Sequence, residues 1–106
     1  MSMITATARP MIRDVQKAVA AEFGISLEEL LTPTRTVRLA RPRQVAMFLA
    51  EELTGRKRSV IADAFRRDWK AIKEGVSRIG MLIEADPDLS LRIERLRLRI
   101  GTGAPA

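Results

Sequence analysis

The sequence predicts one all-α domain of about six helices that contains a helix-turn-helix. Three observations support this prediction. Apolar residues recur at helical spacing along most of the chain, side chains that cap helices precede several of these segments, and a short helix is separated from a longer one by a tight break. The 106 residues are 46% apolar and 30% charged, which suits a single small domain. We expect the domain to span residues 11–100, with a flexible lead over residues 1–10 and a flexible tail over residues 101–106.

The first two helices have clear boundaries. Residues 11–23 carry apolar side chains at helical spacing, and Gly24 is a natural stop. Ser26 then begins a Ser-Leu-Glu-Glu run, in which the serine caps the first turn and Glu29 reaches back to it. This short helix should extend through Leu31 and end at Thr32-Pro33.

A basic connector and two further helices follow. Residues 34–40 form the connector, and Pro42 suits the first turn of a helix because its missing N–H costs nothing there. That helix should end at Thr54-Gly55, and Arg56, Lys57 and Arg58 should form a basic turn. Ser59 is the expected N-cap of a two-turn helix over residues 60–65.

The C-terminal part should contain a long helix and a final segment with two possible interpretations. Asp68 is the expected N-cap of an amphipathic helix over residues 69–85, which Asp86-Pro87 interrupts. Asp88 could cap the final segment, over residues 88–100. This segment has a helical apolar stripe, but Leu96 to Ile100 also alternates with period two, and we interpret it as a helix. It could close the core or present Leu91 and Leu98 to a partner.

Composition excludes several classes of function. The chain has no cysteine and no histidine, so disulfides, thiolate chemistry and the commonest base and metal ligand are all missing. We expect no catalytic residues, no metal site, no cofactor and no enzyme activity. No Gly-x4-Gly-Lys-Ser/Thr phosphate loop occurs, so nucleotide-driven chemistry is not expected of these residues. No apolar stretch is long enough to span a membrane and no secretory signal is visible, so we expect a cytoplasmic, nucleoid-associated protein without a membrane partner.

Positive charge is concentrated in the middle of the chain. The formal net charge is +6, and residues 35–73 hold 11 basic and 4 acidic residues. All the excess cations therefore lie in this block, which predicts a polyanionic partner. Within it, residues 59–85 read as a helix-turn-helix, whose second helix would present its first turn to base edges in the major groove. The residues available there are Arg66, Arg67, Trp69, Lys70 and Lys73.

The same residues resemble a known family. The run from Leu39 to Thr54 (Leu-Ala-Arg-Pro-Arg-Gln-Val-Ala-Met-Phe-Leu-Ala-Glu-Glu-Leu-Thr) precedes Ile61-Ala-Asp-Ala-Phe and Arg67-Asp68. Together they resemble the C-terminal DNA-binding domain of the bacterial replication initiator DnaA, over about residues 11–85. Similar stand-alone domains occur in activators of gene transfer agents. The resemblance implies an all-helical helix-turn-helix fold, and the segment 88–100 would be an additional helix.

The resemblance also implies roles for particular residues. A family arginine that enters the minor groove matches Arg35, one that contacts DNA matches Arg43, and the Arg-Asp that starts the recognition helix matches Arg67 and Asp68. The family usually reads Gly-Gly-Arg-Asp-His-Thr-Thr at that point. Here the turn is one residue shorter, and Trp69-Lys70-Ala71 replaces the base-reading His-Thr-Thr. We therefore expect duplex binding to persist with a different target sequence.

Alternatives stay open for each candidate residue. Arg35 inserts into a narrow minor groove or is a solvated cation. Arg41 and Arg43 form a phosphate site at a helix N-terminus, or are surface charge. The cluster Arg56, Lys57 and Arg58 clamps the DNA backbone or only solubilises a turn.

The start of the long helix carries its own alternatives. Trp69 packs in the core under Phe65, or contacts a thymine methyl or a sugar edge. Asp68 is a cap or accepts from a cytosine amino group. Lys70 and Lys73 are expected to contact DNA.

The sequence thus predicts a sequence-specific double-stranded DNA-binding protein that regulates transcription. Replication control at origin-type boxes and a helical protein-interaction module with a basic face are the alternatives. A sigma-like protein, RNA polymerase or a second DNA-binding subunit could be a further partner, since one helix-turn-helix buries little surface.

Overall fold

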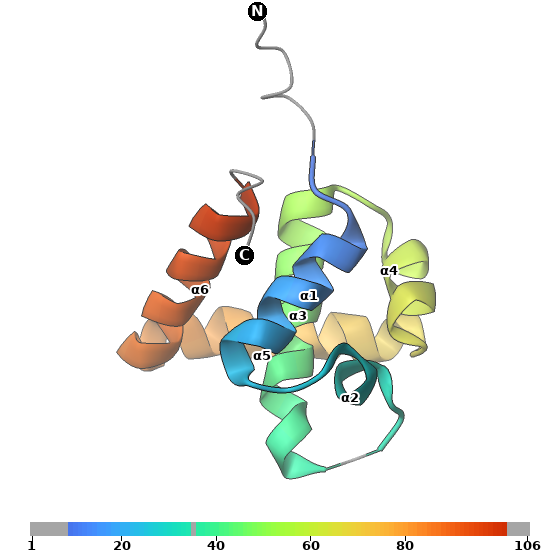
Figure 1. Cartoon of the computed structure of the whole chain (residues 1–106), viewed down its shortest axis with the longest axis horizontal. Coiled ribbons are helices and arrows are strands. Elements are labelled where there is room, and N and C mark those ends of the chain that lie inside the picture. Colours follow the sequence, from blue (N-terminus) through green and yellow to red (C-terminus); the bar gives the residue numbers. More distant parts are fainter. Residues whose placement is uncertain (1–8, 35, 102–106) are drawn as a thin grey trace, which may run out of the picture.

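A computed structural model describes residues 9–34 and 36–101, and every regular element among them is helical (Figure 1). The helices are α1 (Ile12–Phe23), α2 (Leu27–Leu31), α3 (Val37–Thr54), α4 (Arg58–Phe65), α5 (Trp69–Ala85) and α6 (Pro87–Gly101). This confirms the predicted all-α class. Most of the expected flexible lead and tail lie outside the described residues. Over the described ranges, no helix combines the length and apolarity that crossing a bilayer requires.

Three of the expected helix ends are confirmed by their local geometry. Gly24 ends α1 in the left-handed conformation, with φ at 68°, which glycine adopts without steric cost. The Ser26 hydroxyl accepts from the Glu29 N–H at 2.9 Å and the Glu29 carboxylate accepts from the Ser26 N–H at 3.0 Å. The Asp68 carboxylate accepts from the Ala71 N–H at 3.0 Å and so caps α5.

The predicted start of the third helix is wrong. Instead of beginning at Pro42, α3 begins at Val37, so the proline lies inside the helix. Its missing N–H leaves the carbonyl of Arg38 without its usual intrahelical partner. The preceding turn is held by tertiary contacts, because Leu39 is buried at 4% exposure and Arg38 forms an ion pair with Glu29 of α2 at 2.9 Å. Burial of one leucine and an interhelix contact therefore extend the helix by five residues beyond what local rules indicate.

Two helix caps differ from the prediction, and one ambiguous segment is resolved. The N-cap of α4 is Lys57 and not Ser59, so α4 starts one residue before the expected cap. The Asp86 carboxylate, rather than that of Asp88, caps α6 by accepting from the Leu89 N–H at 3.1 Å. The segment that was ambiguous between helix and strand is helical throughout.

α3 is the central element of the domain. In Figure 1, α1 lies in front of α3 and α5 crosses behind it. Gly75 marks the close approach of α5 to α3, because a Cβ there would lie 3.2 Å from the Met47 sulfur and 3.7 Å from the Gln44 Cα. The core collects buried residues from all six helices, among them Val15, Leu30, Val45, Ile61, Ile72 and Ile93. The two helices of the helix-turn-helix, α4 and α5, thus pack on α3, which also contacts α1, α2 and α6.

α6 closes the side of the domain away from α4. Its helical stripe of Leu89, Ile93, Leu96 and Ile100 is buried in the common core, which settles its structural role. Arginines on the polar edges of α6 contact α1 and α3. Arg97 holds both Glu52 carboxylate oxygens, at 2.7 and 2.9 Å, and the Arg95 guanidinium pairs with Glu22 at 3.0 Å. Arg92 lies over the Phe23 ring, 4.7 Å from its centroid. Leu91 and Leu98 remain exposed on the outer face.

Replacing Ile93 by alanine should lower the free energy of unfolding by about 2–5 kcal/mol, because it leaves a cavity where a fully buried side chain joins α6 to the core. Leu91→Ala on the exposed face of the same helix is the matched control and should change stability by about 0.5 kcal/mol or less. Chemical denaturation followed by circular dichroism measures both. Equal effects of the two substitutions would show that α6 is not part of the cooperative core.

Candidate nucleic-acid interface

The turn between α4 and α5 is tight and depends on backbone geometry. Arg66 has φ at 57°, the one positive value among the non-glycine residues that the structure describes. This conformation lets the N–H groups of Arg66 and Arg67 return to the carbonyls of Asp63 and Ala62, at 3.2 and 3.0 Å. These two bonds close the end of α4. Asp68 then caps α5, so three residues, 66–68, separate the two helices.

The first turn of α5 presents cations and one large aromatic side chain to solvent. Arg66, Lys70 and Lys73 are exposed, and Arg67 is half-buried. Trp69 is 54% exposed, so the alternative that it packs in the core is wrong. The inward face of the same helix holds Ile72 and Ile79, which are fully buried. α5 therefore has one face committed to packing and a start that is free to contact a ligand.

The carboxylate of Asp68 is engaged by the helix itself. Because its Oδ1 accepts from the Ala71 N–H, the cap is the role that the structure shows for this side chain. A negative charge at this end of α5 also interacts favourably with the positive end of the helix dipole.

A buried glutamine, which was not among the predicted site residues, fixes the end of α4. Gln16 of α1 is 4% exposed, and its Nε2 donates to the Ala64 carbonyl at 3.1 Å. That carbonyl lies in the last turn of α4, where intrahelical donors run out. The bond ties the first helix of the helix-turn-helix to α1. The sequence signal for this role is the spacing, because Gln16 lies on the same apolar stripe of α1 as Ile12 and Val19.

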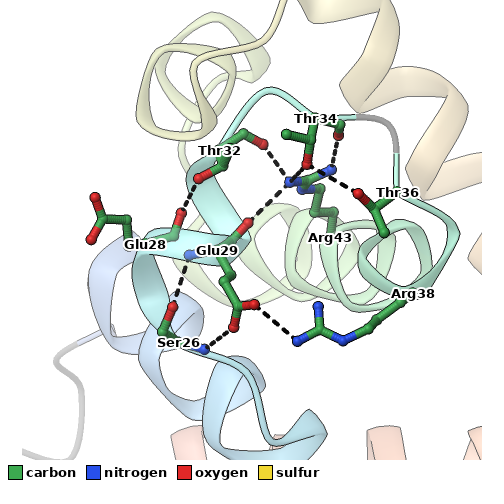
Figure 2. A network of polar contacts seen from close by, with 8 residues as sticks. All are labelled: Ser26, Glu28, Glu29, Thr32, Thr34, Thr36, Arg38 and Arg43. Carbon is green, nitrogen blue, oxygen red and sulfur yellow. Dashed lines mark hydrogen bonds and ion pairs between the residues drawn. The ribbon is translucent and has the colours of Figure 1, made fainter.

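The corner between α2 and α3 is a network of polar contacts, shown in Figure 2. Glu29 is its centre: its carboxylate accepts from the Ser26 N–H and from the Arg38 guanidinium at 2.9 Å. The Ser26 hydrogen bond, followed by the Arg38 contact, lowers the pKa of the exposed Glu29 carboxyl below its ordinary value. Glu29 thereby joins the first turn of α2 to the first turn of α3.

Arg43 lies inside this corner, and not on the surface as the predicted phosphate site would require. Its residue is 5% exposed. Its Nε donates to the Leu30 carbonyl at 2.9 Å, and Nη2 donates to the Glu29 carbonyl at 3.0 Å. The guanidinium also donates to the carbonyls of Thr32 and Thr34 (Figure 2). Burial, and then the neighbouring charge of Arg67, lower the pKa of Arg43.

Arg41 is separated from Arg43 by the geometry of the helix. Because both belong to α3 and not to its N-terminus, residues two apart lie on different faces. Arg41 is exposed, bonds Gln44 at 2.8 Å, and lines a recess together with Phe23 and residues such as Asp88 from the start of α6. The expected joint phosphate site of Arg41 and Arg43 is therefore not formed.

The basic turn before α4 lies apart from the start of α5. Arg56, Lys57 and Arg58 are exposed at the opposite end of α4 from Arg66, a separation of about 12 Å for eight helical residues. Arg58 donates to both carboxylate oxygens of Glu51, so its charge is partly neutralised. The predicted minor-groove residue, Arg35, lies outside the described residues.

The structure nevertheless brings two distant segments together. Arg67, in the turn of the helix-turn-helix, is close enough to Arg43 for its charge to act on that guanidinium. The corner between α2 and α3 is therefore within electrostatic reach of the turn that starts α5. Among the described residues, no group of three or more acidic side chains could hold a metal ion. The turn itself carries two cations, of which Arg66 is exposed and Arg67 half-buried.

Comparison with known proteins shows which family the chain belongs to. The model of the bacterial DnaA protein helix-turn-helix matches residues 12–79, which include α1 to α4 and most of α5. The chain belongs to the bacterial DnaA helix-turn-helix family. A DnaA-type domain of this kind binds double-stranded DNA, which agrees with the cationic start of α5.

Curated DnaA proteins resemble the chain over a longer stretch. The chromosomal replication initiator proteins DnaA of Nitrobacter hamburgensis, Nitrobacter winogradskyi and Rhodopseudomonas palustris are each 38% identical over 93 residues. These alignments cover 87% of the chain and 20% of each relative, so the chain spans about a fifth of the length of these DnaA proteins. An alignment of this coverage cannot stop before α6 begins, so the similarity to DnaA extends beyond α5.

The lowered pKa of Glu29 predicts an acid-sensitive corner in the DnaA-type domain. A carboxyl whose folded pKa is depressed stabilises the fold above its ordinary pKa, and this contribution is lost as pH falls through the lowered folded value. The stability difference between the unmodified protein and Glu29→Gln should therefore shrink below about pH 4. Denaturant unfolding at several pH values measures it, with Glu28→Gln in the same turn as control. A difference independent of pH would contradict the assigned contacts.

Proposed function

We propose that the chain is a transcription regulator that recognises a specific duplex sequence through the first turn of α5. The observation that carries the proposal is the exposed start of that helix, where Trp69, Lys70 and Lys73 project next to Arg66. In a helix-turn-helix this turn faces base edges in the major groove, while the preceding helix lies across the backbone. Binding to chromosomal DNA would place the protein at the nucleoid.

The charge distribution supports a duplex partner for the same face. Arg66 and Arg67 stand in the turn immediately before α5, where they can meet phosphates flanking the bases. Arg56 and Lys57, about one α4 length away, are positioned for a more distant phosphate. The loop before α3, with Arg35 in it, is the proposed contact to the adjacent minor groove.

Departure from the family pattern favours a target other than an origin box. The resemblance implies that His-Thr-Thr reads the bases in the family. Here Trp69-Lys70-Ala71 stands in its place. Because base contacts specify and phosphate contacts position, this change alters the preferred sequence more than the affinity for duplex. A protein that binds promoter sequences fits this change better than a protein that binds the DNA boxes of its relatives.

Control of replication is the second candidate, and the names of the relatives favour it. The proteins that the chain resembles are chromosomal replication initiators. Nothing in the comparisons argues for a sigma-like or RNA polymerase partner, so both candidates rest on DNA alone.

Removing a cation from the start of α5 should weaken duplex binding in a salt-dependent way. Lys70→Gln should reduce the slope of log affinity against log salt by about 0.9 if it removes one phosphate contact. If Lys70 contacts a base, the variant should instead lose about 1–3 kcal/mol of discrimination. Lys17→Gln on α1, across α3 from α5, is the matched control and should change neither quantity. Titrations of duplex, single strand and heparin distinguish these outcomes, and equal losses for all three ligands would indicate a general acidic partner.

A chromatin-immunoprecipitation map tests the regulatory role. Enrichment at a few promoters is expected, and it should decrease for Lys70→Gln but not for Lys17→Gln. Enrichment at a single origin would support the second candidate. A map without enrichment in expressing cells would contradict both.

A further inference from the structure

We infer that Arg43 is a positioning residue of the DNA interface: its buried guanidinium holds the loop between α2 and α3 beside the turn of the helix-turn-helix, and it does not itself bind phosphate. The inference rests on the proposed duplex binding and assigns one residue within it. It reverses the role that the resemblance implies for this arginine.

The donors of Arg43 are already used within the protein. An arginine has five N–H donors in a rigid planar fork and no acceptor. Here the fork reaches four backbone carbonyls, those of Glu29, Leu30, Thr32 and Thr34. With 5% of the residue exposed, a phosphate could reach the guanidinium only if this set of bonds were broken.

The bonded carbonyls explain why a buried cation is tolerated without a carboxylate partner. Glu29 and Leu30 are in the last turn of α2, where carbonyls lack intrahelical donors and carry the negative end of the helix dipole. Thr32 and Thr34 flank Pro33 in the loop that follows. Arg43 is therefore the C-terminal cap of α2 and the internal support of the loop at once (Figure 2).

The position of this support connects it to DNA binding. Arg43 belongs to α3, the helix against which α5 packs. The charge of Arg67, in the turn between α4 and α5, acts on the Arg43 guanidinium. One side chain thus fixes the loop to α3, the helix against which α5 packs. If the freed loop adopted the binding arrangement about one tenth of the time, apparent affinity would fall about tenfold without loss of any direct contact.

Arg43→Lys tests the inference while keeping the charge. A single ammonium cannot reproduce the fork, so the loop should loosen, and hydrogen exchange at the Thr32 amide, which donates to the Glu29 carbonyl, should accelerate. Specific duplex affinity should fall about tenfold with an unchanged salt slope, and scrambled duplex should be affected less. Lys70→Gln is the comparison for a direct contact, since its slope or its base discrimination should change. Thermal unfolding confirms that the variants compared are folded at the temperature of the titration.

A measurement on the unmodified protein avoids dependence on the variant. The Arg43 Nε–H should remain protected from solvent exchange in the nuclear magnetic resonance spectrum, both free and bound to duplex. Exposure or a large shift of this signal on DNA binding would overturn the inference, as would full affinity of a folded Arg43→Lys variant. If the unmodified protein binds no duplex, the proposed function fails. If it binds and Arg43→Lys binds equally well, only the positioning role fails.

Discussion

A single guanidinium, buried among backbone carbonyls, organises the corner between α2 and α3. Arg43 donates to carbonyls at the end of α2 and in the loop that follows it. These carbonyls have no hydrogen-bond donor within α2 itself. These bonds link a short helix, a proline-containing loop and the central helix. Because an unpaired buried cation would be costly, the loop must stay where its carbonyls meet the fork.

The helix-turn-helix is supported from two other directions. Gln16 secures the end of α4 from α1, and the close approach at Gly75 seats α5 against α3. Packing commits Ile72 and Ile79 to the interior and leaves the first turn of α5 exposed. The tryptophan and the cations at that turn are therefore available because the apolar face of the same helix is fully used elsewhere.

Helices with strong local signals were predictable from sequence. The Ser26–Glu29 box, the stop at Gly24 and the Asp68 cap each depend on residues within three or four positions of one another, so the chain alone specifies them. The amphipathic stripe of α5 likewise followed from its 3.6-residue period. Family membership rested on a contiguous run of residues around Pro42, so it too could be recognised from the sequence.

Tertiary contacts decided what local patterns could not. The proline at position 42 suggested a helix start, but burial of Leu39 and the Arg38–Glu29 ion pair carry α3 five residues further back. That extension places Arg41 and Arg43 on different faces, one toward solvent and one among carbonyls. The sequence by itself determined the helices with their caps, the charge of the middle segment and the family. Which arginines face solvent was decided only by folding, because the carbonyls that capture Arg43 come from residues 9 to 14 positions away along the chain.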